Sequence, residues 1–515
     1  MAPSTAVVAL GCVGAAYVFL AALLHLTQDP KEPPTLETSI PFLSPMSALF
    51  QGMPKYLVSL RNKHNLPIYT LRMPGARIYV VNSLSLIPQV QKKYKTIAFP
   101  PIASQAAELV YGVGPAGNAI IGSEKMFEDG SYLNTFVSST APALSPGPGL
   151  DAITGAAVRF AADSLAEISR KGGVKVELLD WVRQQIFKAK TEAIYGPNNP
   201  FRDPALATAW YRLTNVWLDS DFEPGVIFHM LKAWPSVFAP KSLHARDKLI
   251  IPAFEKYYAS QQHLTGSLLV QCYYNHNIEH GLRGRDVAAT EIGHLMGALG
   301  NTMVGAYWML YHIFSDPVVL EELREELEKL VVVGEDGLST INLARVKSSA
   351  PILHSTWQET LRYVHIGISA RMVVEDVMLD NRYLLKKGAT LMTAAPIQHS
   401  DPALWGPTVD DFDHRRFLRQ PGKKRTSPAA FQAFGGGHVL CPGRHFATTF
   451  VMSLTALLLL RFDMKPLSKD GNWHEPRKHI PMTSAMPIPK DELRIELCPR
   501  DDREWQVDFS SLEKI

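Results

Sequence analysis

The chain has 515 residues, enough for one large enzyme domain or several smaller ones. Its 52 Lys and Arg residues nearly balance 49 Asp and Glu residues, so no strong field attracts nucleic acid, and we expect no nucleic-acid partner. The cysteines lie far apart without a C-x-x-C pair, which argues against a disulfide framework or a zinc site and favours a reducing compartment. They are Cys12, Cys272, Cys441 and Cys498.

The N-terminal region predicts a membrane anchor. After a short tail of residues 1–5, residues 6–26 carry no Asp, Glu, Lys or Arg, and their length matches the roughly 20 residues that a helix needs to cross a bilayer. A cleaved signal peptide is the alternative, but no basic segment precedes the run and the run exceeds the usual roughly 7–15 apolar residues. Lys31 follows the span, which predicts a cytoplasmic body. The prolines of residues 27–41 indicate a stiff tether, and residues 42–515 form the folded body.

Strand and loop patterns follow in the first part of this body. Residues 68–73 and 77–82 are β-rich and flank Pro74-Gly75-Ala76, so they predict a hairpin. Residues 85–95 have helical spacing. Residues 99–121 alternate prolines, glycines and apolar residues without a clean period, which indicates a long loop.

Helical patterns dominate the middle of the chain. Residues 151–169 and 176–195 show apolar residues at three- and four-residue intervals, which predicts two amphipathic helices. Residues 203–262 are rich in aromatic side chains, which are more often core than ligand contacts. Residues 286–314 contain no proline and predict a helix of roughly 40 Å. Its small residues 297–302 either admit a planar ligand or simply allow close packing, and Thr302 can bond back to a carbonyl.

Charged residues recur in a pattern after this long helix. Glu359 and Arg362 are three apart in the predicted helix 353–363, so their side chains share one face. An exposed pair of this kind contributes little to stability, which leaves an ordinary surface pair as the alternative. Arg371 opens a β-rich stretch, and Arg416 lies in the run Phe412-Asp413-His414-Arg415-Arg416-Phe417.

A glycine-rich turn precedes a single cysteine near the C-terminus. Phe434 and Gly435-Gly436-Gly437 lead to Cys441, and an apolar helix is expected from about 444 to 460. The glycines allow close approach of a flat ligand, and the helix N-terminus favours a thiolate over a thiol. This pattern predicts a thiolate ligand for a metal cofactor. A buried cysteine after an ordinary turn is the alternative.

The order Phe434, Gly437, Cys441, Gly443 resembles the haem-binding signature of the cytochrome P-450 (haem-thiolate) family. In that family the cysteine sulfur is the axial iron ligand of haem b, and the thiolate favours O–O cleavage. Residues 297–302 resemble the groove of the family's central helix, where an acid and a threonine relay protons. Thr302 matches the threonine, but Asn301 stands at the acid's place and cannot donate a proton as an acid. The same Asn occurs in the branch of sterol hydroxylases and prostacyclin synthase.

The resemblance also assigns the charged residues. Glu359 and Arg362 match the Glu-x-x-Arg element and Arg416 matches the second arginine motif, which implies a buried charge network. An arginine near Arg371 holds a haem propionate in the family. The usual second propionate arginine is replaced here by Val439, so His438 is either its substitute or an ordinary loop histidine. The family's Trp-x-x-x-Arg is not visible within residues 124–133, and residues 203–262 correspond to a lid over the substrate entrance.

The resemblance implies a mainly α fold with a smaller β region (α+β), the cytochrome P-450 fold, behind one N-terminal transmembrane helix. It implies a monooxygenase of the endoplasmic reticulum membrane, with its catalytic domain cytoplasmic and membrane lipid around its anchor. This enzyme oxidises a lipophilic small molecule with O2 and electrons from NADPH-cytochrome P-450 reductase. The motif details look most like fungal members that make secondary metabolites such as terpenoids, steroids or alkaloids. The alternatives are a reductase-independent isomerase or dehydratase and a non-catalytic haem-binding membrane protein.

Overall fold

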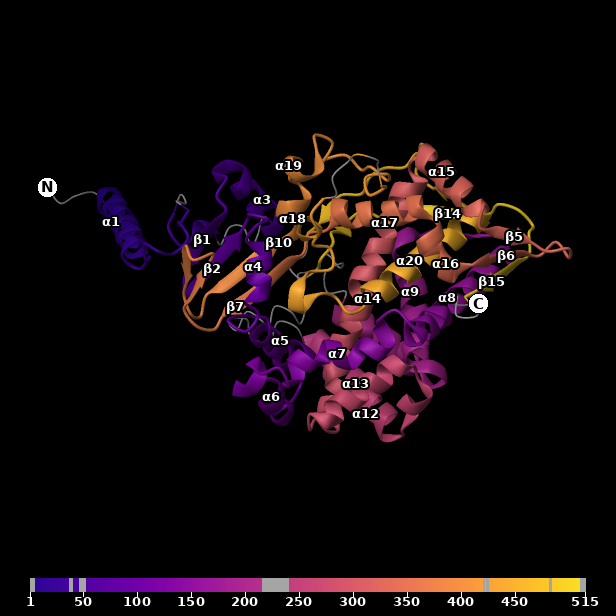
Figure 1. Ribbon diagram of the computed structural model, residues 1–515, viewed down its shortest axis with the longest axis horizontal. Coiled ribbons are helices and arrows are strands. Elements are labelled where there is room, and N and C mark those ends of the chain that lie inside the picture. The colour runs from indigo at the N-terminus through magenta and orange to yellow at the C-terminus, as the bar shows by residue number, and fades with distance from the viewer. Residues whose placement is uncertain are drawn as a thin grey trace. The chain divides into compact units, whose positions relative to one another are not determined.

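The chain forms two compact units in a computed structural model (Figure 1). The structure describes residues 5–36, 40–45, 52–214, 240–419, 422, 426–480 and 484–509. Unit 1 comprises Met1–Ile102, His365–Asp410 and Arg425–Leu440. Unit 2 comprises Ala103–Val364, Asp411–Lys424 and Cys441–Ile515. The first unit is built around a sheet and the second around helices, so the structure has the expected mainly α character with a smaller β region.

Unit 1 contains a five-stranded sheet in the order β1-β2-β10-β7-β3. The expected hairpin is confirmed, because β1 and β2 pair antiparallel around a turn in which Gly75 has a φ of 67°. Only the β2–β10 pairing of this sheet is parallel. A separate ribbon joins β8 to β9. The strands are β1 (Ile68–Met73), β2 (Ala76–Val81), β3 (Ile97–Ala98), β7 (Ile368–Val373), β8 (Val377–Leu379), β9 (Tyr383–Leu385) and β10 (Thr390–Ala394).

Short helices cover this sheet. One apolar cluster includes Ile87 and Val90 of α4 with strand residues such as Tyr79, and another joins Leu57 and Leu60 of α3 to Tyr69. The helices of unit 1 are α1 (Thr5–Leu26), α3 (Met53–His64), α4 (Ile87–Lys92), α18 (Ala395–His399) and α19 (Pro402–Trp405), with 3-10 turns η9 (Pro428–Ala430) and η10 (Gly437–Val439). Helix α5 (Pro100–Ala106) crosses the boundary between the units.

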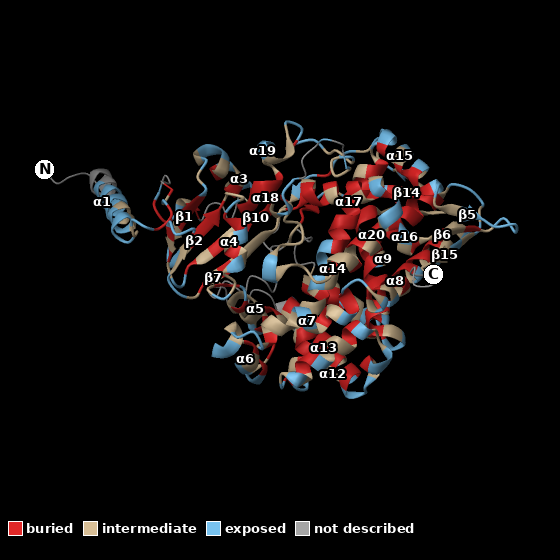
Figure 2. Cartoon of the chain, viewed as in Figure 1, coloured by how far each residue is buried: buried red, intermediate tan, exposed pale blue. Residues whose placement is uncertain are grey.

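The N-terminal helix α1 is one long element of 22 residues. No helix within the described residues is both long and apolar enough to cross a membrane, so the structure does not support the expected transmembrane span at residues 6–26. Several large apolar side chains of α1 are nevertheless exposed, and Figure 2 shows most of the helix in pale blue. The exposed fractions include 68% for Val13, 65% for Phe19 and 82% for Leu26.

The tether expected at residues 27–41 is partly packed onto unit 1. The carboxylate of Glu32 accepts a hydrogen bond of 2.6 Å from the Tyr79 hydroxyl and pairs with Arg77 Nε at 3.2 Å. Thr70 N–H donates to the Pro34 carbonyl at 2.8 Å, and Leu36 is buried. The ordered body of unit 1 therefore begins near Glu32, and residues 37–39 lie outside the described residues.

Unit 2 holds most of the helices. The α-helices are α6 (Pro115–Ile121), α7 (Tyr132–Leu144), α8 (Pro148–Arg170), α9 (Leu178–Tyr195), α10 (Pro204–Thr214), α11 (Pro240–His244), α12 (Ile251–Ala259), α13 (Leu268–Glu279), α14 (Arg285–Phe314), α15 (Pro317–Glu328), α16 (Leu343–Ser349), α17 (Pro351–Val364) and α20 (Arg444–Arg461). The shorter π and 3-10 segments are η1 (Ala107–Tyr111), η2 (Glu124–Phe127), η3 (Gly196–Asn198), η4 (Pro200–Arg202), η7 (Ala245–Ile250) and η8 (Gln262–Thr265).

Three small sheets lie within unit 2, with the strand orders β11-β14-β4, β15-β6-β5 and β12-β13. Their strands are β4 (Val174–Glu177), β5 (Val331–Val333), β6 (Ser339–Asn342), β11 (Phe462–Pro466), β12 (Lys478–His479), β13 (Ile488–Pro489), β14 (Arg494–Pro499) and β15 (Trp505–Asp508).

Helix α14 is the central helix of unit 2. It has 30 residues and packs against α9, α12, α17 and α20. The Asp286 carboxylate in its first turn accepts hydrogen bonds from the Gly114 and Gly117 N–H groups at 2.6 and 2.9 Å, which fixes its N-terminus to α6. From Thr302 to its end the helix is almost wholly buried, and α20 is buried along most of its length (Figure 2). Both predicted helices, 286–314 and 444–460, are confirmed.

Two further sequence predictions, besides the transmembrane span and the tether, differ from the structure. Residues 99–121 are largely helical, because α5, η1 and α6 occupy this stretch, so the loop prediction is wrong. The pattern at 176–195 begins as a strand, since Val174–Glu177 pairs with β14 before α9 starts. Of the aromatic segment 203–262, residues 215–239 lie outside the described residues, and the lid prediction there stays a prediction.

Candidate functional site

Cys441 stands three residues before the start of α20, and the boundary between the units falls just before it. In unit 1 the preceding turn needs its glycines, because Gly435 and Gly437 have φ values of 71° and 61°. A Cβ at Gly436 or Gly437 would also lie 2.3 or 2.8 Å from the Gln91 side chain. The sequence therefore forms a tight turn that ends at a cysteine ahead of a buried helix.

The Cys441 sulfur is partly buried, and none of the four cysteines is in a disulfide. Burial raises the pKa of its thiol, whereas the Gly443 N–H, the Lys190 ammonium, the Arg444 guanidinium and the Arg444 N–H oppose that rise. The N–H groups at the start of the helix therefore favour the thiolate, as expected, while burial opposes them and the net direction of the pKa is upward. A bound metal ion deprotonates a coordinating thiol outright, which means that iron would complete this change.

One face of α14 is open along its middle. Gly297 and Gly300 are exposed, and among the described residues a Cβ built on either would meet nothing within 4 Å. Asn301 lies on the same exposed face, and its Oδ1 accepts a hydrogen bond of 3.3 Å from the Ala485 N–H. The small residues predicted between 297 and 302 therefore leave free space beside this helix rather than serving close helix packing.

Thr302 points away from Asn301, toward α9. The side chain is 6% exposed, and its hydroxyl donates to the Ala298 carbonyl at 3.3 Å. The same Oγ1 accepts a hydrogen bond of 2.9 Å from Lys190 Nζ. The two residues predicted to act in proton delivery thus have separate polar partners.

Glu359, Arg362 and Arg416 lie together in unit 2. Arg362 donates from Nε and Nη2 to the two Glu359 oxygens at 2.8 and 2.7 Å, and Arg416 Nε donates to Oε1 at 3.0 Å. Glu359 is fully buried and also accepts from the Asp413 N–H at 3.1 Å. Because the pairing is bidentate and desolvated, it differs from an ordinary surface i,i+3 pair. This carboxylate holds α17 against the segment that carries Arg416.

Arg371 and His438 belong to unit 1. Arg371 lies on β7 and is 3% exposed, and within the described residues its Nη1 has no hydrogen-bond partner. Burial lowers its pKa. A buried cation with an unused donor fits an anionic group such as a haem propionate. His438 is exposed, and its ring packs edge-on against the Tyr94 ring with 3.8 Å between the two ring centroids. Phe434 is partly buried.

Sequence reasoning missed Lys190. It lies on α9 four residues after Ile186 and four before Ile194, both of which are buried. This spacing places a lysine on the apolar face of an amphipathic helix, which is the signal that could have revealed it. Lys190 is the only charged side chain within hydrogen-bond distance of Thr302 among the contacts that the described residues make.

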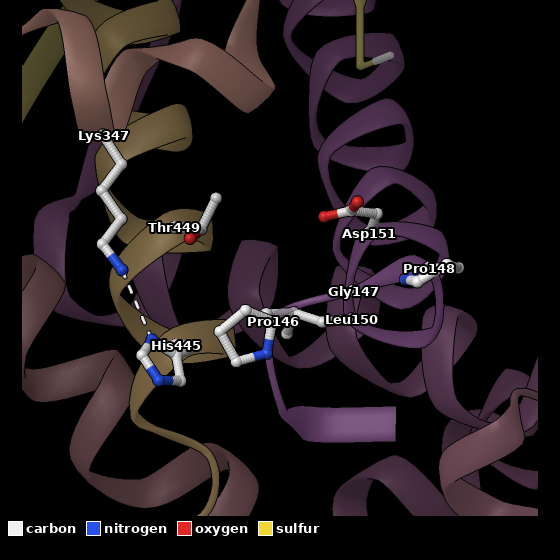
Figure 3. A pocket seen from close by; sticks show the side chains of 8 residues that line it. All are labelled: Pro146, Gly147, Pro148, Leu150, Asp151, Lys347, His445 and Thr449. Carbon is white, nitrogen blue, oxygen red and sulfur yellow. Dashed lines mark hydrogen bonds between the residues drawn. The ribbon is translucent and has the colours of Figure 1, made fainter. Parts of the chain in front are cut away.

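A separate pocket lies in unit 2 between the start of α8 and the helices α16 and α20 (Figure 3). Its volume is about 390 Å³, and Lys347 Nζ lies 3.4 Å from His445 Nδ1 at its wall. Burial lowers the pKa of both groups. Neither Cys441 nor Thr302 lines it. The lining residues are Pro146, Gly147, Pro148, Leu150, Asp151, Lys347, His445 and Thr449.

The Cytochrome P-450 family model matches residues 33–495. Since this match spans most of the chain, the protein belongs to the cytochrome P-450 family and has its fold. It is a cytochrome P-450 monooxygenase, and the cofactor of this family is haem b with an axial cysteine thiolate.

Several relatives match along nearly the whole chain. The protein is 32% identical over 494 residues to cytochrome P-450 monooxygenase nodJ of Hypoxylon pulicicidum, which covers 93% of this chain and 92% of that protein. It is 24% identical over 491 residues to cytochrome P-450 7B1 of Mus musculus, and this match covers 89% of this chain and 90% of that protein. A shorter match of 29% identity over 195 residues links it to the 25-hydroxycholesterol 7-alpha-hydroxylase of Rattus norvegicus, covering 35% and 47%.

Proposed function

We propose that this monooxygenase hydroxylates a rigid, lipophilic polycyclic molecule of the terpenoid, steroid or alkaloid kind, as a step in secondary-metabolite biosynthesis. The observation that carries the proposal is that unit 2 contains both a cysteine just before α20 and a helix, α14, whose glycine face is open among the described residues. The name of the rat relative, a hydroxylase of 25-hydroxycholesterol, supports a substrate of this size and polarity.

Each site residue has a distinct task in this proposal. Cys441 provides the axial thiolate, Arg371 neutralises a propionate, and the turn at Phe434, Gly437 and Gly443 lets the main chain lie close to a flat ring. His438 is a second propionate partner from the turn. The haem supplies the activation of O2 for insertion of one oxygen atom into a C–H bond. Thr302 holds a proton at Oγ1, and Asn301 orients polar groups without donating an acidic proton.

The network of Glu359, Arg362 and Arg416 has a structural task in this proposal. Its bidentate geometry keeps α17 and the Arg416 segment in register. None of the three side chains takes part in the chemistry.

The electrons come from NADPH through a separate cytochrome P-450 reductase, and the protein attaches to the endoplasmic reticulum membrane with its catalytic part in the cytoplasm. The exposed apolar side chains of α1 support membrane attachment, because water-exposed Val, Phe and Leu side chains gain free energy in lipid. The uncharged sequence of residues 6–26 supports it as well.

The first test is the carbon monoxide difference spectrum of the reduced, purified protein. We expect the red-shifted Soret band of thiolate ligation, and we expect Cys441→Ser to abolish it. Cys272→Ser is the matched control, because Cys272 lies on α13, and it should keep the band. A band that survives Cys441→Ser would contradict the ligand assignment.

The substrate proposal is tested by turnover. Polycyclic terpenoids and steroids should change the ferric spectrum on binding and gain one oxygen atom only when NADPH and reductase are present. Product formed without either of them would instead favour the isomerase or dehydratase, and the absence of any binding signal across the library would favour a non-catalytic haem protein.

A further inference from the structure

Lys190 is a buried lysine with two polar contacts on α14. It is 1% exposed, and its Nζ donates to the Ala298 carbonyl at 2.7 Å and to Thr302 Oγ1 at 2.9 Å. On its other side α20 presents two aromatic rings, with Nζ 4.7 Å from the centroid of Phe446 and 5.8 Å from that of Phe450. Lys190 therefore joins α9 to both α14 and α20.

The charge of Lys190 determines how the Thr302 hydroxyl is used. An ammonium has three donors and no acceptor, so Thr302 Oγ1 must accept from it. The Thr302 proton then stays available for the Ala298 carbonyl or for a ligand beside α14. A neutral amine has a lone pair that would compete for this proton and turn the hydroxyl away.

The groups that contact Lys190 Nζ are ones that can hold an ammonium. Burial lowers its pKa to about 7, whereas the Cys441 sulfur raises it. The groups that α14 and α20 present to its ammonium are a carbonyl, a hydroxyl and two phenyl rings, and Cys441 is the titratable group that acts on it within the described residues. The aromatic faces stabilise a cation.

We propose that Lys190 is a positioning residue: its ammonium donates to Thr302 Oγ1 and so directs the Thr302 hydroxyl to act as a hydrogen-bond donor. The proposal rests on the proposed roles of Thr302 and Cys441. This role differs from that of an acid that passes a proton on, because the Lys190 ammonium keeps its protons and acts by fixing the orientation of the Thr302 hydroxyl.

The test compares Lys190→Met with Lys188→Met in the haem-loaded protein. Methionine has a similar length without charge, and Lys188 is an exposed lysine on the same helix. The first readout is the C–O stretching frequency of the carbon monoxide complex, which falls when a donor points at the ligand. We expect Lys190→Met and Thr302→Val to raise this frequency alike, the double variant to match Thr302→Val, and Lys188→Met to match the wild type.

The second readout is the reduction potential of the haem iron. Loss of the buried positive charge beside Thr302 should make the potential more negative in Lys190→Met and leave it unchanged in Lys188→Met. The third readout is the ratio of product to NADPH consumed, which should fall about ten-fold in Lys190→Met, the usual scale for losing a charged hydrogen bond. Thermal unfolding should not be lowered, because replacing a buried charge by an apolar side chain is often neutral or stabilising.

The outcomes separate two failures. If Lys190→Met keeps the wild-type stretching frequency and potential while the thiolate Soret band is normal, the role of Lys190 is refuted and the proposed function stands. If the wild-type protein lacks that band, the proposed function itself fails. A lower unfolding temperature together with unchanged spectra would make Lys190 a packing residue only, which also refutes the positioning role.

Discussion

At the scale of single residues, buried charges distinguish this protein from an ordinary helical domain. Glu359 is itself fully buried and is the acceptor for two guanidinium groups and one backbone N–H. Removing one member of such a group leaves the others buried without a counter-charge, which costs far more than the pair contributes. The network is therefore a sensitive point in the stability of unit 2.

We predict that Glu359→Ala lowers the free energy of unfolding by about 3–5 kcal/mol, because Arg362 and Arg416 become uncompensated buried cations. Denaturant titration measures this loss, and the haem content of the purified protein should fall with it. Glu167→Ala is the control, since Glu167 forms an exposed pair with Lys171 at 2.6 Å. That variant should unfold like the wild type. Equal stability of the two variants would contradict a buried network.

At the scale of elements, α14 has glycines in two different environments. Gly300 faces open space, whereas a Cβ at Gly293 would lie 2.5 Å from the ring of Tyr111 in η1. Glycine within a helix is otherwise a disadvantage because of its backbone entropy. The first glycine therefore keeps a face of the helix free, and the second permits close packing.

We predict opposite effects of alanine at these two positions. Gly300→Ala should stabilise the protein without haem by about 0.5–1 kcal/mol, because helix propensity rises and nothing is displaced. Gly293→Ala should destabilise it by about 1–3 kcal/mol, because the Tyr111 ring must move. Thermal unfolding of both variants measures the difference. A destabilised Gly300→Ala would show that this face is not open.

At the scale of the whole molecule, the ordered body begins earlier than the tether prediction implies. Glu32 and Leu36 are buried against β1 and β2, although the prolines around them suggest an unattached linker. The prolines remove N–H donors, but the Pro33 and Pro34 carbonyls still accept hydrogen bonds from Thr70 at 2.7 and 2.8 Å. This segment is part of unit 1.

We predict a sharp difference between two N-terminal truncations. A chain that starts at Gln28 keeps the Glu32 contacts and should unfold at the wild-type temperature. A chain that starts at residue 37 leaves the Tyr79 hydroxyl and Arg77 without their carboxylate and should lose about 1–3 kcal/mol. Thermal unfolding of the purified proteins measures this difference. Equal stability would place the start of the body after residue 36.

The sequence was most informative where a residue type and its spacing have one physical solution. The absence of proline over 286–314 predicted α14, and β-rich runs on either side of Pro74-Gly75-Ala76 predicted the β1–β2 hairpin. The spacing of Glu359 and Arg362 placed both on one helix face, but the approach of Arg416 to them is a tertiary contact that spacing does not contain. The same limit hid Lys190, because its meaning depends on Thr302, 112 residues away. At 99–121 the prolines lie in the first turns of helices, where a missing N–H costs nothing. The prolines that suggested a loop therefore stand at the starts of helices.

The raised pKa of the Cys441 thiol has a consequence for assembly. Iron binds the thiolate form of a cysteine, so a thiol that carries its proton must release it when the iron–sulfur bond forms. Each step toward acidic pH therefore makes haem capture less favourable, and mildly alkaline conditions favour it. Maturation of this protein is thus a proton-releasing reaction, coupled to the acidity of the compartment in which the chain acquires its haem.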